Sequence, residues 1–170
     1  LRFTDANIAF DLDGNAGQVY RLYKAAFDRT PDLAGLGGWI VGMDAGELGL
    51  QQVASRFIAS AEFQNLYGVN PSNSQFITAL YLNVMGRSPD TGGFGNWVDQ
   101  LARSVQTRPQ VLVSFSESGE NKAAVLPLLS NGILYASAEQ AAGPALGRTL
   151  TGTPGADTLV AGVGNDTFNG

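Results

Sequence analysis

The glycines and aspartates at the C-terminal end have the most specific spacing in this sequence. Two consecutive nonapeptides fit the pattern G-G-x-G-x-D-x-U-x except at one glycine each, where Thr153 and Ala161 stand. In this pattern U is a large apolar residue, here Leu159 and then Phe168. Glycine permits tight turns, and carbonyl and carboxylate oxygens are the ligands that calcium prefers. The run therefore predicts a calcium half-site and a β-roll-like tail, against the alternative of a flexible or disordered linker. The predicted ligand positions are Gly152, Thr153, Gly155, Asp157, Gly162, Gly164 and Asp166.

A second group of oxygen-bearing side chains lies near the N-terminus. Its members are Asp5, Asp11, Asp13 and Asn15. An EF-hand would require glycine where Ala16 stands and glutamate where Leu22 stands, so that motif is excluded. Two interpretations stay open: a calcium loop of another type, or an Asx-turn that leads into a helix starting near Gln18.

Composition narrows the possible chemistry. The 170 residues include no cysteine and no histidine, which excludes thiolate and imidazole ligands and the commonest general base. With a net charge of −5 the chain has no basic footprint, so we expect no nucleic-acid partner. No apolar run reaches the ~18 residues that a membrane span requires. An enzyme would need a carboxylate pair, drawn from Glu62, Glu117 and Glu120, and we expect no catalytic activity.

The sequence repeats itself at one constant offset. Residues 20–62 align with residues 78–120 without a gap, and many identical residues coincide. Apolar residues recur at helical spacing in both copies. The pattern predicts an all-α, compact multi-helix bundle of two similar halves, about 18–67 and 76–125. The repeated polar and aromatic pairs are Arg29, Asp32, Trp39 and Glu62, which match Arg87, Asp90, Trp97 and Glu120.

We expect these repeated residues to be structural. Asp32 and Asp90 follow prolines, where an aspartate caps a helix, and each arginine should reach Glu62 or Glu120. The two tryptophans should lie in the core. Weaker candidates for ligand contact are aromatic residues that we expect to be exposed: Tyr20, Tyr67 and Phe94.

The remaining segments complete the predicted organisation. Residues 1–17 are expected to be loop-like and to pack on the helices of a domain over 18–135, whose last helix extends over 123–135. Residues 136–150, rich in small residues, form a linker, and 151–170 begin the repeats. The chain starts at Leu1 and stops within a nonapeptide, which indicates a fragment of a longer protein.

Two resemblances follow from these motifs. The tail resembles the RTX, or hemolysin-type, calcium-binding repeats of proteins exported by type I secretion. The helical part resembles the DUF4214 domain through residues 10–17, 20–23, 27–32 and 60–63 with Trp39, and through 80–84, 86–90 and 115–118 with Trp97. These resemblances imply a bacterial protein that is secreted or held at the cell surface, with calcium as its cofactor.

Three functions are compatible with this sequence. The leading expectation is a non-catalytic, calcium-dependent, extracellular binding or adhesion module that recognises cell-surface carbohydrate or another envelope component. The first alternative is a structural domain that self-associates within a secreted RTX surface protein. The second is a glycan-acting enzyme that uses carboxylates.

Overall fold

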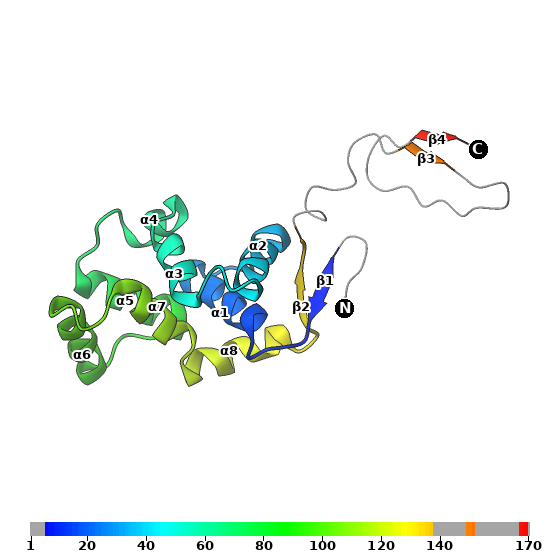
Figure 1. The fold of residues 1–170 in the computed structure, drawn as a ribbon. Coiled ribbons are helices and arrows are strands. Elements are labelled where there is room, and N and C mark those ends of the chain that lie inside the picture. The colour runs from blue at the N-terminus through cyan, green and yellow to red at the C-terminus, as the bar shows by residue number, and fades with distance from the viewer. Residues whose placement is uncertain (1–5, 138–148, 152–166, 170) are drawn as a thin grey trace.

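Helices make up most of the chain in the computed structural model, which describes residues 6–137, 149–151 and 167–169 (Figure 1). The described residues contain eight helices, so the all-α prediction is confirmed. The first four are α1 (Asn15–Phe27), α2 (Leu33–Asp44), α3 (Leu50–Ile58) and α4 (Ala61–Tyr67). The next four are α5 (Asn73–Met85), α6 (Thr91–Ala102), α7 (Arg108–Ser116) and α8 (Gly119–Leu129). The same offset that aligns the two copies of the sequence also separates the first residue of each helix from that of its counterpart.

Short polar side chains determine where the helices start. The Asp32 carboxylate accepts a hydrogen bond from the backbone N–H of Gly35 at 2.7 Å, and Asp90 accepts one from Gly93 at the same distance. Such bonds satisfy N–H groups that the first turn of a helix leaves without an intrahelical acceptor. Four more helices have hydroxyl caps: Ser60, Ser72, Thr107 and Ser118 begin α4, α5, α7 and α8.

Helix α1 is the centre of the fold. Every residue from Val19 to Phe27 except Lys24 is buried, as expected for a helix that is covered on all sides. Helices from both halves pack against it, including α2, α3, α5, α7 and α8. The two halves therefore share one core. Its largest fully buried side chains include Leu22, Leu36, Phe76, Ile77, Leu80 and Leu112.

The edges of the helical part differ from the sequence prediction. Strand β1 (Asn7–Ala9) lies in the segment predicted to be a loop, and α1 begins at Asn15 rather than near Gln18. The chain leaves α8 at Leu129 and passes through Gly132, whose φ of +89° favours glycine, into strand β2 (Ile133–Tyr135). Strands β1 and β2 pair antiparallel. This pairing joins the two ends of the helical part. A sequence pattern between neighbouring residues cannot predict a contact between such distant segments.

A second pair of strands lies near the C-terminus. Strand β3 (Thr149–Thr151) runs parallel to β4 (Thr167–Asn169), and Thr149 pairs with Thr167, two nonapeptides later. The last two positions of the predicted linker, 149 and 150, thus belong to a strand. The predicted calcium ligands from Gly152 to Asp166 lie outside the described residues.

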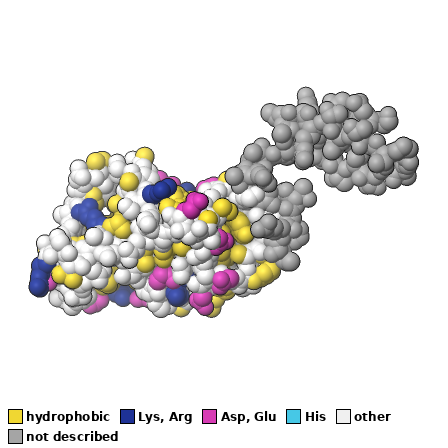
Figure 2. Space-filling model, in the orientation of Figure 1, with side chains coloured by type: hydrophobic (Ala, Val, Ile, Leu, Met, Phe, Trp, Pro, Cys, Tyr) yellow, Lys and Arg dark blue, Asp and Glu magenta, His cyan; other side chains and the backbone are white. Residues whose placement is uncertain are grey.

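The surface of the described helices mixes both signs of charge. Figure 2 shows acidic and basic side chains interspersed with apolar ones over the visible face. Among the described residues, no helix has the length and hydropathy that are needed to cross a bilayer.

Candidate functional site

An arginine–glutamate pair occurs twice, at matching positions of the two copies. Arg29 donates from Nε and Nη2 to the two oxygens of Glu62, at 2.5 and 3.0 Å. Arg87 makes the same two bonds to Glu120, at 2.9 and 3.0 Å. In each pair the hydrogen bonds from the guanidinium lower the pKa of the glutamate below its usual range. These are the partners that the sequence repeat predicts, and they tie the end of one helix to the start of another.

The same arginines cover buried tyrosines. The Arg29 guanidinium lies 5.5 Å from the centre of the Tyr23 ring, a distance typical of cation–π contact. A Cβ at Gly35 would lie 2.8 Å from the Tyr23 hydroxyl oxygen, so a side chain at this position would displace that hydroxyl. Burial raises the pKa of Tyr23, whose hydroxyl accepts a hydrogen bond from Trp39 Nε1 at 3.1 Å. These contacts join helices and leave no open ligand surface on Tyr23.

The aromatic residues proposed for ligand contact are placed differently from the prediction. Tyr20 and Tyr67 are only 8% and 7% exposed, so the prediction of exposure is wrong for both. Tyr67 donates to the Ala25 carbonyl oxygen at 3.2 Å, and burial raises the pKa of Tyr67 to about 12. Phe94 is half-buried, as are Trp39 and Trp97, which pack against the edge of the core.

The N-terminal oxygen-bearing residues do not converge. Asp11 accepts a hydrogen bond from the Gly14 N–H, three residues on, at 2.8 Å, so its carboxylate holds the turn that leads into α1. The Asn15 amide donates instead to Asp44 at 2.7 Å. Within the described ranges no three acidic groups lie close enough to hold a metal ion, and Asp5 is outside those ranges.

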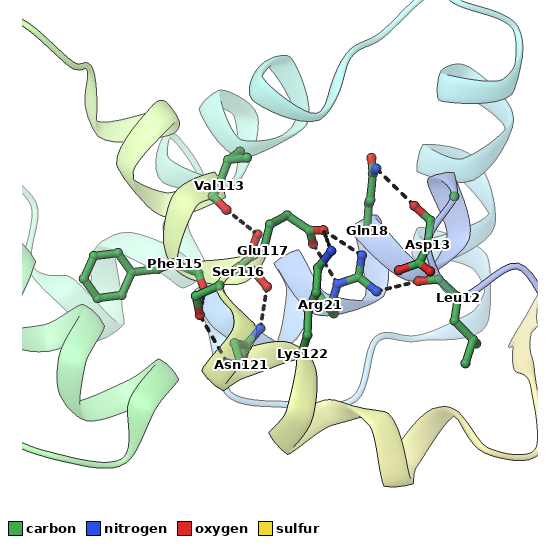
Figure 3. Close-up of polar contacts among 12 residues, drawn as sticks. Leu12, Asp13, Gln18, Arg21, Val113, Phe115, Ser116, Glu117, Asn121 and Lys122 are labelled. Atoms are coloured by element: carbon green, nitrogen blue, oxygen red, sulfur yellow. Dashed lines mark hydrogen bonds and ion pairs between the residues drawn. The ribbon is translucent and has the colours of Figure 1, made fainter.

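A charged network that the sequence did not predict lies between the halves. Arg21 is 3% exposed and donates from Nε and Nη2 to the two oxygens of Glu117, both at 2.7 Å (Figure 3). Its Nη1 donates to the Leu12 carbonyl oxygen at 2.5 Å, and Lys122 Nζ lies 3.2 Å from Glu117. The network therefore links α1, the end of α7, α8 and the segment before α1.

This network has no counterpart at the matching positions of the other copy. In the alignment of the two copies, Arg21 is matched by Ala79 and Glu117 by Ala59. Sequence reasoning that searched for matched residues missed the pair for this reason. The signal that could have found the pair is the lack of a match: one positive and one negative residue, neither of which has a charged counterpart in the other copy.

A cavity of about 280 Å³ adjoins the network. Its walls are Leu12, Asp13, Arg21, Lys122, Ala123, Leu126 and Leu129. A guanidinium has five N–H donors, and the described residues supply acceptors for three of those on Arg21. The wall thus combines the charged Arg21 and Lys122 with the carboxylate of Asp13 and the apolar side chains of Leu12, Leu126 and Leu129, a mixture typical of ligand pockets.

Comparison with known proteins supports the resemblance to the DUF4214 domain over part of the helical region. No curated protein and no solved structure shows significant similarity to the chain. Residues 54–125 match the family described as "Domain of unknown function (DUF4214)". The match extends from within α3 to within α8, so it covers Glu62, Arg87, Asp90, Trp97, Glu117 and Glu120. Residues 54–125 of this chain are therefore a DUF4214 domain.

Proposed function

We propose that this chain is a non-catalytic, extracellular binding module, in which a duplicated helical unit precedes a calcium-ordered β-roll. One observation carries this proposal: β3 and β4 pair in parallel with an offset equal to the length of two nonapeptides. This register places Leu150 beside Phe168, and both occupy the eighth position of the nonapeptide period. Parallel strands repeated at the period of the motif are the geometry expected of a calcium-binding β-roll.

Calcium is the cation that fits the sequence of this segment. Asp157 and Asp166 occupy the sixth positions of their nonapeptides, and the chain carries neither histidine nor cysteine for softer metals. Extracellular calcium modules bind the ion at about 10⁻⁴–10⁻³ M, which suits a protein exported by type I secretion to the exterior or the bacterial surface.

Calcium titration of the whole chain tests this function. We expect calcium, but not magnesium, to bind at about 10⁻⁴–10⁻³ M by calorimetry and to raise the β signal in far-ultraviolet circular dichroism. The double variant Asp157→Ala, Asp166→Ala should lose both responses. Asp99→Ala is the matched control, because Asp99 is exposed on α6 and pairs only with Arg103 among the described residues. An unchanged response in the double variant would contradict the proposed site.

The carboxylates considered for catalysis take part in ion pairs within the fold, which supports a non-catalytic role for them. A general acid needs a raised pKa at neutral pH, whereas arginine contacts lower the pKa of Glu62 and Glu120. Both oxygens of Glu117 bind Arg21, and Lys122 lies against one of them. Each candidate thus serves as the anionic partner of an arginine.

The cavity beside Arg21 favours a ligand class for this module, an acidic sugar of the cell envelope. Arg21 and Lys122 line the cavity and suit a sugar carboxylate, Asp13 suits a sugar hydroxyl, and Leu12, Leu126 and Leu129 suit the apolar face of the ring. This assignment replaces the buried Tyr20 and Tyr67 as the carbohydrate-contacting group.

Titration with glucuronate and with glucose tests this ligand class. We expect glucuronate to bind more tightly, and Lys122→Met to weaken it at least about tenfold through loss of a charge-assisted bond. Lys24→Met is the control, because Lys24 pairs with Asp28 and does not line this cavity. Equal affinity for the two sugars would exclude a carboxylate site here, and would leave the calcium test unaffected.

A further inference from the structure

The outer side of α2 is covered by the chain itself. Gly37 lies against the carbonyl of Ala136, just after β2, and a Cβ at Gly37 would overlap that carbonyl oxygen. The Ala136 N–H donates to the Leu33 carbonyl oxygen at 2.8 Å, at the start of α2. A short extended segment is thus held on the helix by close backbone approach and one main-chain hydrogen bond.

Helix α6 lacks this cover. Gly95 is the counterpart of Gly37 in the second copy and is exposed, with no described atom within 4 Å of an added Cβ. None of the α6 side chains is fully buried, and α5 is the main element packed against it. Figure 1 shows α6 at the end of the helical part that is remote from β1 and β2.

Three large side chains on each helix also differ in burial. On α2, Leu36, Ile40 and Met43 are 1%, 3% and 9% exposed. The residues at the matching positions of α6 are only half-buried: Phe94, Val98 and Leu101. The apolar positions of the two helices match, yet those of α6 remain partly open to solvent.

We propose that α6 binds an extended peptide segment of another polypeptide, in the register that residues 133–136 adopt on α2. A small residue of that segment would lie against Gly95, and its N–H would donate to the Thr91 carbonyl oxygen. A large apolar residue would stand three positions earlier, as Ile133 does relative to Ala136. The recognition chemistry is therefore main-chain hydrogen bonding and apolar burial.

A second copy of this chain is a poorer occupant. Its own segment 133–136 already covers α2, where Ile133 is 1% exposed and β2 pairs with β1. Moving that segment onto a neighbour's α6 would uncover α2, so the exchange buries no additional surface. A segment from a different polypeptide has no such alternative site, and the proposal does not depend on calcium or on the cavity beside Arg21.

A fluorescently labelled peptide with the sequence of residues 132–137, Gly-Ile-Leu-Tyr-Ala-Ser, tests the proposal on the whole chain. We expect saturable binding by fluorescence anisotropy, weakened at least about tenfold by Gly95→Ala, whose Cβ occupies the space required by the peptide carbonyl. A peptide with Ala136→Pro lacks the donating N–H and should bind correspondingly weakly. Gly38→Ala is the control, since Gly38 is exposed on α2 and an added Cβ there would have no described atom of another segment within 4 Å.

The outcomes separate the possibilities. Gly95→Ala retains its fold, because alanine favours helix more than glycine and the site is open, so lost binding with unchanged circular dichroism supports the proposal. Equal binding by the Gly95→Ala variant overturns it. It is also overturned if analytical ultracentrifugation shows self-association that Gly95→Ala abolishes, because a second copy would then be the occupant.

Discussion

Replacing Glu117 with alanine is expected to lower the free energy of unfolding by about 3–5 kcal/mol. The loss is large because Arg21 is 3% exposed and both of its bonds to this carboxylate would disappear. A buried guanidinium without its counter-ion bears the cost of desolvation without compensation. Urea denaturation followed by circular dichroism measures the effect.

Glu120→Ala is the matched control for Glu117→Ala. It removes the same kind of bidentate bond at a nearby position of the chain, but Arg87 and Glu120 are 44% and 49% exposed. Water solvates either partner when the other is lost, so we expect a much smaller effect. The double variant Arg21→Met, Glu117→Leu should recover most of the loss, because it leaves no buried charge. Equal effects of Glu117→Ala and Glu120→Ala would contradict the burial of Arg21.

The same substitution at Gly37 and at Gly95 is expected to change stability in opposite directions. Gly37→Ala should destabilise the fold by about 1–3 kcal/mol, because its Cβ overlaps the backbone of Ala136 and only a shift of the segment after β2 relieves the overlap. Gly95→Ala should stabilise it by up to about 1 kcal/mol, since alanine loses less conformational entropy in a helix. Paired urea or thermal unfolding experiments measure both changes.

Gly38→Ala distinguishes packing from helix propensity. Gly38 lies on α2 beside Gly37 but has open space around it, so its variant should behave like Gly95→Ala. A Gly37→Ala protein as stable as the parent would mean that the segment after β2 does not lie on α2 as described.

Much of the helical architecture was predictable because it is determined locally and occurs twice. The Asp32 and Asp90 caps, the chain breaks before them and the pairing of Arg29 with Glu62 all follow from spacing that recurs in both copies of the sequence. A residue pair that is present in only one copy cannot be recognised in this way. The Arg21–Glu117 pair joins positions far apart in the chain and has alanines at the matching positions. A comparison of the two copies therefore could not predict this pair or the cavity beside it.

The sequence by itself determined the starts of α2 and α6, the all-α class and the partners of the repeated charges, because caps and periodicity act between neighbours along the chain and the repeat marks residues that act together. Only the tertiary structure decided which copies of a repeated residue are covered. Gly37 is packed and Gly95 is open, and Tyr20 is buried although its pattern allowed exposure, because α1 lies at the centre and α6 at an end. The physical reason is that burial depends on which distant segments return to cover a surface, and two similar units in one chain cannot both occupy the centre.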